Sequence, residues 1–343
     1  MGLRRAAFIG CGPRASEHAR AYRLVERGQP VAACARTSLH AEAFCRDHRI
    51  ERSYTDPRRM LEVERPDLLH IVTQPDQRVA LMTMAAEHQV PVVIVEKPIA
   101  IEGEDWAQLV ALASATSTRF VVNTQLHFHP RNAELRRDVS EGRIGEVRFI
   151  DASAGCSILD QGVHLLELAH SFAAYATPKR VFAQMAGVAE LDTPQPSPDI
   201  SIVAVEFDGG IRAEMVTGDI APRVVQTEPF YLQKRIAVYG TRGFVHWTMF
   251  GWERFTEEGG YESGAHDYFA EDDRGQAALT DAAFGLLDGA DEHATGIERS
   301  LLEFNVVLGA YVSALHRKPV PLPCDPPDSL VAALRDALTH HGV

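Results

Sequence analysis

A lysine that directly follows a buried strand is the first group in this sequence suited to proton chemistry. Residues Val92 to Val95 are all apolar and β-branched, which predicts a central parallel strand. Glu96, Lys97 and Pro98 come next, at the strand end where open α/β sheets hold their ligands. An ammonium group, unlike a guanidinium, can release its proton when it is partly buried. Lys97 is therefore a candidate catalytic residue, although the tripeptide alone also fits a strand end with a solvated ion pair.

A carboxylate and an imidazole four residues apart form a second chemical pair. Asp160 is expected to cap a helix N-terminus, which would place His164 one turn later on the same helix face. An imidazole that titrates near neutrality can exchange a proton with an alcohol or carbonyl, and a nearby carboxylate can bind substrate or orient the ring. Taken alone, the pair is also typical of a capped helix with a surface histidine.

A glycine-rich turn separates a predicted strand, Ala6 to Ile9, from a predicted helix that ends near Arg27. In this pattern Gly10 permits a tight turn, Gly12 lets the backbone approach a pyrophosphate, and Ala15 permits close helix packing. The helix N-terminus would present N–H groups to the phosphates. We assign the turn to a dinucleotide site made of Gly10, Cys11, Gly12, Pro13, Arg14 and Ala15. The alternative is a tight turn without a ligand.

The end of the second predicted strand, Val31 to Cys34, bears on the choice of cofactor. The acidic residue that commonly binds the ribose 2′-hydroxyl is missing, and Ala35 removes a carboxylate that would repel a 2′-phosphate. Arg36, Thr37 and Ser38 supply a cation and two hydroxyl groups instead. The sequence thus predicts that NADP(H) is favoured over NAD(H). If Arg36 stacks on the adenine or lies in solvent, the preference would be mixed.

Strands and helices alternate as far as residue 125, which indicates right-handed βαβ units in a doubly wound parallel sheet. Thr73, Gln74 and Pro75 follow one of these strands and are assigned to the nicotinamide end of the cofactor site, although an ordinary turn also fits. The remaining residues assigned to the cofactor are Glu96, Lys97 and Gln125.

After residue 125 the pattern becomes rich in strands. Gly209 and Gly210 join two of them as a hairpin, and we expect a large, mostly antiparallel open sheet with helices. The fold class is therefore α/β, with a Rossmann domain over residues 1–125 and a second α/β domain over residues 126–343. Leu191 to Asp199 and Glu257 to Asp273 are expected to be surface excursions.

Composition limits the classes of function. With 343 residues, 45% of them hydrophobic, the chain is long enough for two globular cores. The formal net charge of −13 argues against nucleic acid or an anionic membrane as partner, and no apolar run is long enough to span a bilayer. Five scattered cysteines indicate a reduced, cytoplasmic protein. His127 and His129 have no evident third ligand, so we expect no metal and give them structural or substrate-contact roles.

Three of these motifs occur together in one known family. Gly10 to Ala15, Glu96 to Pro98 and Asp160 to His164, in this order and separation, resemble the glucose-fructose oxidoreductase, inositol dehydrogenase and rhizopine-catabolism (Gfo/Idh/MocA) family. Glu141 to Val147 and Gly240 to Gly243 also resemble turns of that family. The resemblance covers nearly the whole chain.

The resemblance implies a function for the whole chain. It implies NAD(P)(H)-dependent hydride transfer between nicotinamide and a secondary alcohol or ketone of a sugar, cyclitol or related small molecule. It further implies that the C-terminal domain binds substrate and forms a homodimer or homotetramer through its sheet. Lys97 would hydrogen-bond or protonate the reacting oxygen, His164 would act as general acid or base, and Asp160 would hold the substrate.

The sequence departs from the family pattern at three places. His127 replaces an arginine, Arg78 stands where a histidine is common, and Ala154 to Leu159 directly connect a strand to a helix where many relatives insert a longer loop. The pocket would therefore be more open, or be closed by another subunit. Two alternatives stay open. The family resemblance also allows a regulatory protein that senses NADP(H) without turnover, and the short connection allows a reductase of an imine or larger biosynthetic intermediate.

Overall fold

The computed structural model describes residues 2–340, and this part of the chain divides into two compact units. The first unit comprises the residues up to Ala100, Ala107–His129 and Phe269–Leu301; the second comprises Ile101–Trp106, Pro130–Tyr268 and the residues from Leu302 onward. Packing thus adds residues 269–301 to the N-terminal unit, whereas the predicted boundary at residue 126 assigns them to the second domain.

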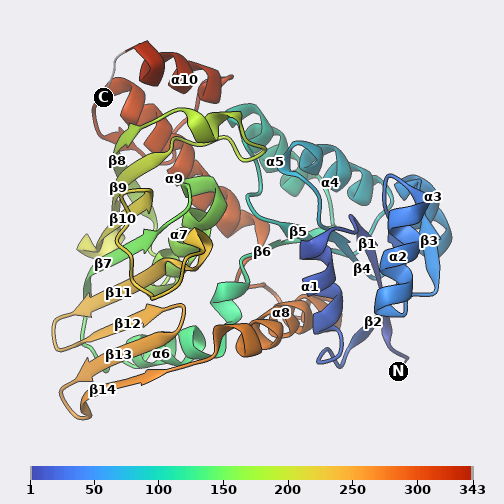
Figure 1. The fold of residues 1–343 in the computed structure, drawn as a ribbon, viewed down its shortest axis with the longest axis horizontal. Coiled ribbons are helices and arrows are strands. Elements are labelled where there is room, and N and C mark those ends of the chain that lie inside the picture. The colour runs from blue at the N-terminus through green and yellow to red at the C-terminus, as the bar shows by residue number, and fades with distance from the viewer. Residues whose placement is uncertain (1, 341–343) are drawn as a thin grey trace. The chain divides into compact units, whose positions relative to one another are not determined.

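Six strands of the described chain form a parallel sheet in the order β3-β2-β1-β4-β5-β6 (Figure 1). Their bounds are β1 (Arg4–Ile9), β2 (Gly28–Cys34), β3 (Arg52–Tyr54), β4 (Leu68–Ile71), β5 (Val92–Glu96) and β6 (Arg119–Asn123). This order confirms the predicted doubly wound sheet. It reverses between β1 and β4, and a crevice for ligands is expected at that reversal.

Helices accompany this sheet, and all of them except α8 connect its strands. Their bounds are α1 (Pro13–Ala21), α2 (Ser38–His48), α3 (Pro57–Glu64), α4 (Arg78–Glu87), α5 (Gly103–Ala115) and α8 (Tyr268–Gly285), with short 3₁₀ turns at Pro75–Gln77 and Gln125–Phe128. The prediction that the first helix reaches Arg27 is wrong. After Ala21 backbone amides donate to the carbonyl three residues earlier, as in a 3₁₀ turn, and the chain then enters β2 at Gly28. A Cβ at Gly28 would lie 2.2 Å from the Phe284 ring.

The core of the first unit explains why residues 269–301 belong to it. Ala277 and Phe284 of α8 pack with Leu68, Ile94 and Val121 of the parallel sheet. The segment after α8 also covers the outer edge of β6, because the Thr295 carbonyl accepts the amide of Val122 at 2.9 Å. These contacts join residues far apart in the sequence, so local patterns do not reveal them.

The second unit contains nine strands of the described chain, in the order β14-β13-β12-β11-β7-β10-β9-β8-β15. Their bounds are β7 (Val147–Ala154), β8 (Pro178–Ala186), β9 (Ile200–Phe207), β10 (Arg212–Gly218), β11 (Lys234–Gly240), β12 (Phe244–Thr248), β13 (Gly251–Thr256), β14 (Gly260–Ala265) and β15 (Val320–Pro321). Of the described neighbouring pairs, β7 and β10 are parallel and the others antiparallel, which confirms the prediction of a mostly antiparallel sheet.

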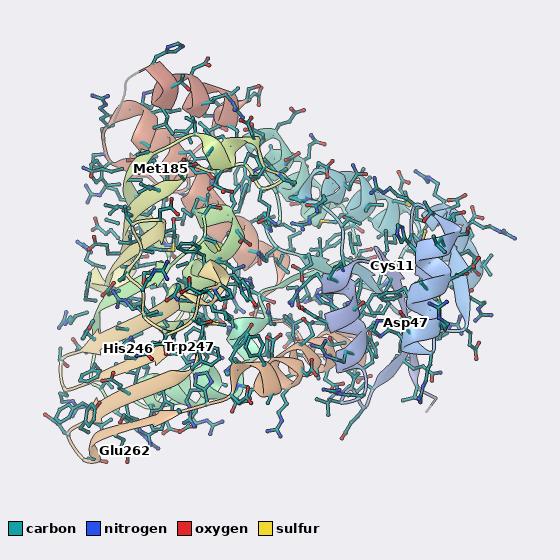
Figure 2. The ribbon with its side chains drawn as sticks, in the orientation of Figure 1. Cys11, Asp47, Met185, His246, Trp247 and Glu262 are labelled. Atoms are coloured by element: carbon teal, nitrogen blue, oxygen red, sulfur yellow. The ribbon has the colours of Figure 1, made fainter. Side chains whose placement is uncertain are left out.

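The remaining α-helices of the described chain are α6 (Pro130–Ser140), α7 (Val163–Phe172), α9 (Ile297–His316) and α10 (Leu330–His340). Of these, α6 contacts β12, and α7 contacts β7, β10 and β11. Successive residues of β12 alternate in burial: Trp247 is fully buried and its neighbour His246, also labelled in Figure 2, is only partly buried. The sheet therefore has one packed face and one more exposed face.

Two predicted surface excursions are wrong in part. Residues 257–273 contain β14 and the start of α8; β14 is an exposed edge strand and so lacks the apolar alternation of a half-buried strand. In the other segment Leu191 and Ser197 are buried, and the Ser197 hydroxyl lies 3.3 Å from that of Tyr311. Among the described residues, no helix combines the length and hydropathy needed to cross a bilayer.

Candidate active site

The end of β1 is held against its neighbours by a glycine that the fold requires. Gly10 has a φ of +103°, and a Cβ there would lie 2.0 Å from the carbonyl oxygen of Val72, just past β4. Its amide donates to the carbonyl of Cys34 at the end of β2 over 2.9 Å. The ends of three adjacent strands therefore meet at this turn.

Gly12 has a different reason to be glycine. Its φ is negative, and a Cβ there would meet no atom within 4 Å, so the protein itself does not exclude a side chain. The space beside Gly12 fits the close approach of a pyrophosphate to the backbone. Pro13 begins α1 without a side-chain cap, which leaves the first-turn N–H groups for a ligand, and buried Ala15 packs against Phe8 and Val72. Cys11, labelled in Figure 2, donates its thiol to the Cys34 carbonyl at 3.5 Å.

The end of β2 combines an exposed cation with a helix N-terminus. Arg36 is exposed, and Ser38 is the first residue of α2. Thr37 is the N-cap, because its hydroxyl accepts the amide of His40 at 3.4 Å. Since the Thr37 hydroxyl is engaged in capping, Arg36 and Ser38 are the better placed groups for a 2′-phosphate.

Thr73 and Lys97 follow the ends of β4 and β5, which are neighbours in the sheet. The Thr73 hydroxyl donates to the Gln74 carbonyl at 3.3 Å, and Pro75 opens a 3₁₀ turn. Lys97 is partly buried and precedes a cis peptide bond to Pro98. The topology therefore gathers the predicted phosphate loop, the predicted nicotinamide loop and Lys97 at one edge of one sheet.

Glu96 is a buried acceptor at the centre of this edge. Its Oε1 accepts hydrogen bonds from Arg14 Nε at 2.9 Å, His18 Nε2 at 2.8 Å and Asn123 Nδ2 at 2.6 Å. Burial alone would raise the pKa of the Glu96 carboxyl, but the Arg14 charge and the His18 hydrogen bond outweigh it and hold that pKa well below its usual range. The Glu96 carboxylate is thus buried and pairs with Arg14, whose side chain is 30% exposed, so this carboxylate is not part of a pair held only in solvent.

Two buried histidines extend this network away from Glu96. His18 Nδ1 lies 3.1 Å from His70 Nδ1, and the Tyr22 hydroxyl lies 2.8 Å from His70 Nε2. Burial lowers the pKa of both imidazoles, so both rings are neutral at pH 7. Because ionised Glu96 accepts the His18 Nε2 proton, His70 must donate to His18, and Tyr22 must donate to His70. The chain of donors therefore runs in one direction, from Tyr22 to Glu96.

We expect acid to destabilise the first unit, beginning near pH 6.5. Burial lowers the pKa of His293 from 6.5 to about 4 and also lowers the pKa values of His18 and His70. Below pH 6.5 the unfolded chain binds more protons than the folded protein. The free energy of unfolding therefore has its highest value above pH 6.5 and falls as the pH drops toward 4. At roughly 1.4 kcal/mol per unit, His293 alone contributes about 3 kcal/mol, of which about 2 kcal/mol is lost by pH 5. Urea unfolding at pH 7.5 and pH 5 measures the loss.

The matched control for this pH dependence is His316, which is exposed at the end of α9. His316→Gln should leave the difference between the two pH values unchanged. Equal unfolding free energies of the wild type at both pH values would contradict the expected role of the buried histidines.

The remaining predicted residues of the first unit follow β6. Gln125 is buried in the 3₁₀ turn, and its Nε2 donates to Asp272 Oδ1 at 3.4 Å. His127 is buried with its ring centroid 4.8 Å from that of Phe128, and His129 Nε2 lies 3.4 Å from Glu271 Oε2. Gln125 therefore follows the C-terminal end of β6, and its contact with the cofactor stays a prediction.

In the second unit the predicted helix cap at Asp160 is wrong. The Ser157 carbonyl accepts the amides of Gln161 at 3.1 Å and Gly162 at 3.2 Å, which makes a wider π-helical turn over Ile158–Gly162. Asp160 lies inside this turn, and α7 begins only at Val163 with Gly162 as N-cap. The α-helical spacing assumed between Asp160 and His164 does not apply. π-turns of this kind are frequent at functional sites.

The π-turn is linked to a buried lysine that sequence reasoning missed. Gln161 Nε2 donates to Asp160 Oδ1 at 3.0 Å, and Gln161 Oε1 accepts from Lys234 Nζ at 2.7 Å. Lys234 is buried at the start of β11, and His164 is buried in the first turn of α7. Asp160 and His164 lie in the second unit, whereas Lys97 and every residue assigned to the cofactor lie in the first.

The two sheets and the glycine turn together define a class of protein. A parallel sheet of this order, with an unhindered glycine turn at its reversal point, is a dinucleotide-binding fold, and a mostly antiparallel sheet follows it. Residues 4–124 match the model of the oxidoreductase family with an NAD-binding Rossmann fold, and residues 148–246 match the GFO/IDH/MocA C-terminal domain. The chain belongs to the Gfo/Idh/MocA family of oxidoreductases.

Relatives of known activity are dehydrogenases. The chain is 29% identical over 136 residues to a trans-1,2-dihydrobenzene-1,2-diol dehydrogenase of Danio rerio, covering 39% of this chain and 40% of that protein. It is 28% identical over 182 residues to a D-apiose dehydrogenase of Paraburkholderia graminis, covering 48% of each. The chain thus spans less than half the length of these two curated relatives.

A solved structure extends the likeness of fold to nearly the whole chain. An oxidoreductase from Agrobacterium radiobacter, in complex with NAD+, L-tartaric acid and magnesium, superposes with a TM-score of 0.81. The two proteins are 21% identical in sequence, and the match covers 93% of this chain and 98% of that one. This similarity concerns the fold.

Proposed function

We propose that this protein transfers hydride between a nicotinamide cofactor and a secondary alcohol or ketone of a sugar, cyclitol or related small molecule. The observation that carries the proposal is the placement of Lys97 beside the predicted nicotinamide loop, at the same edge of the parallel sheet as the glycine turn. The named relatives, which act on a dihydrodiol and on D-apiose according to their names, support this substrate class.

The residues divide the chemistry in the following way. A bound nicotinamide supplies or accepts the hydride. Lys97 hydrogen-bonds the reacting oxygen and moves a proton to or from it, because an ammonium group can change its charge during the reaction. His164 acts as the general acid or base, and Asp160 holds the substrate. Glu96 keeps the strand end that precedes Lys97 in place through the hydrogen bonds that it accepts from three donors.

Nicotinamide absorbance tests this proposal. Turnover is measured in both directions with NADP(H) and NAD(H) over a panel of cyclitols, free sugars, sugar phosphates and nucleotide sugars. Turnover of one group would support the proposal and name the substrate class. Tight NADPH binding without turnover of any compound would contradict it, and would favour a regulatory protein that senses NADP(H). The same assay with imines and larger biosynthetic intermediates tests the reductase alternative, which turnover of those compounds alone would support.

We further propose that NADP(H) is favoured over NAD(H). Ala35 leaves the end of β2 without a carboxylate, and exposed Arg36 adjoins the N-terminus of α2, where a phosphate is stabilised.

Arg36→Ala is expected to weaken NADPH binding by about tenfold or more, because hydrogen bonds to charged groups contribute about 1.5 to 3 kcal/mol. NADH binding should change little, since NADH has no 2′-phosphate. Fluorescence titration of both nucleotides measures the two dissociation constants. Equal weakening of NADPH and NADH binding would show that Arg36 acts on the adenine or on the fold instead.

We also propose that a second copy of the chain covers the exposed face of the second sheet. An aromatic row crosses five adjacent strands in register: Phe149, Tyr239, Phe244, Phe255 and Tyr261. Neighbouring ring centroids from Phe149 to Phe255 lie 6.2 to 6.4 Å apart. In a twofold dimer the same surface patch of each copy meets the patch of the other copy. Two uncharged aromatic rows can pack together in this way, whereas two patches of like charge would repel each other.

Tyr239→Glu is therefore expected to dissociate the oligomer. A charge at the centre of the row would be buried without a partner, and loss of a hot-spot residue costs about 2 kcal/mol or more. Light scattering during size-exclusion chromatography gives the mass. Phe269→Glu is the control, since Phe269 is equally an exposed aromatic residue but lies in the first unit. A wild type that is monomeric, or a Tyr239 variant of unchanged mass, would refute the interface.

A further inference from the structure

Arg78 is the most deeply buried cation beside the candidate active site. It opens α4, its side chain is 2% exposed, and it is among the largest fully buried side chains of the described chain. Its Nη2 donates to the carbonyl of Thr73 at 3.2 Å and to the carbonyl of Lys97 at 3.0 Å. One nitrogen thus bridges the segments that follow β4 and β5.

The other two nitrogens of the guanidinium lack hydrogen bonds in the described part of the chain. Both atoms, Nε and Nη1, are buried. Burial lowers the pKa of Arg78 to about 10, against the attraction of the Glu96 and Asp76 carboxylates, and neither carboxylate accepts a hydrogen bond from it. A buried cation in this state is unfavourable compared with an apolar side chain of similar size.

We infer that Arg78 is a positioning residue that holds the Thr73 and Lys97 backbones in fixed register at the active-site edge. A residue kept only for stability would be apolar at this position, because burying two unsatisfied donors costs more than two hydrogen bonds to neutral carbonyls return. The guanidinium instead fixes the relative position of two segments, because it joins the predicted nicotinamide loop at Thr73 to Lys97, which carries the reacting amine. The inference rests on the proposed function for the roles of these two segments.

Arg78→Met separates positioning from stability. Methionine fills similar space without donors, so the urea midpoint of unfolding is expected to stay unchanged or rise. Amide hydrogen exchange within residues 72–78 and 96–102 should speed up by about tenfold, because the bridge between the segments is lost. Once a substrate is identified, kcat should fall by about 100-fold, because small misplacements near the reacting atoms have effects of this size. The NADPH dissociation constant should stay within about threefold of the wild-type value.

Two further variants complete the test. Met82→Ala removes a fully buried side chain from the same helix and should lower the urea midpoint without a selective increase in exchange at the two segments. Arg78→Lys keeps one donor and should restore part of the protection. It also decides the question if the methionine variant does not fold, since a lysine variant that exchanges as slowly as the wild type would then support the bridge.

The results that overturn the inference are distinct from those that overturn the proposed function. Unchanged exchange at both segments in Arg78→Met, or a uniform increase together with a lower urea midpoint, as for Met82→Ala, would show that Arg78 only packs. A wild type without turnover would refute the proposed function, and the exchange measurement would still decide whether Arg78 positions the two segments.

Discussion

Lys97→Ala is expected to lower kcat by about 100-fold to 10,000-fold, the range over which positioned acids and bases contribute. The substitution removes the amine and leaves the backbone carbonyl that Arg78 binds, so the strand end should keep its conformation. The NADPH dissociation constant should remain close to that of the wild type, because the glycine turn is untouched. Stopped-flow or steady-state absorbance and nucleotide titration measure the two effects separately.

Two variants define what the loss at Lys97 means. Lys97→Arg keeps a positive charge but cannot release a proton, so it should not restore turnover. Lys179→Ala removes an exposed lysine paired with Asp208 in the second unit and should leave kcat unchanged. If Lys97→Ala kept more than about a tenth of wild-type turnover, proton transfer would have to be assigned to another group.

Glu96→Ala is expected to lower the free energy of unfolding by about 3 kcal/mol, because each buried donor left without its acceptor costs about 1 to 3 kcal/mol. The change would leave the buried donors His18 and Asn123, and the partly exposed Arg14, without their common acceptor. The hydrogen-bond chain from Tyr22 through His70 and His18 would also lose the carboxylate charge that sets the direction of its donors. Urea unfolding at pH 7.5 measures the difference.

Glu17→Gln is the matched control for Glu96, because Glu17 also pairs with Arg14 but is 39% exposed. Pairs of this kind contribute less than about 1 kcal/mol, so this variant should unfold almost like the wild type. Similar small losses for both substitutions would mean that Glu96 is not the centre of the network. The stabilising effect of Glu96 should also weaken in acid. Its folded-state pKa is depressed, so below the ordinary carboxyl pKa the unfolded chain binds a proton that the folded protein does not.

Much of the first sheet was predictable from local patterns. The β-branched run at Val92 to Val95, the glycine turn after Ile9 and the spacing of helices between strands each follow from preferences of a few neighbouring residues. The requirement for glycine at position 10 is confirmed, because any Cβ there would lie 2.0 Å from the Val72 carbonyl oxygen. The hairpin at Gly209 and Gly210 and the short connection after Ala154 were likewise correct.

Other features depended on contacts that no local pattern encodes. The π-turn around Asp160 follows from two amides that share one carbonyl, and the residues around it are compatible with an ordinary capped helix. The addition of α8 to the first unit depends on packing between Phe284 and strands more than a hundred residues earlier.

The sequence by itself determined the family, the parallel sheet and the segments at its functional edge, because periodicity and turn chemistry act between near neighbours. The tertiary structure alone decided which polar groups meet there. Glu96 receives its donors from residues 14, 18 and 123, and Arg78 reaches the carbonyls of Thr73 and Lys97. A buried polar group must find a partner, but its identity depends on how distant strand ends are brought together.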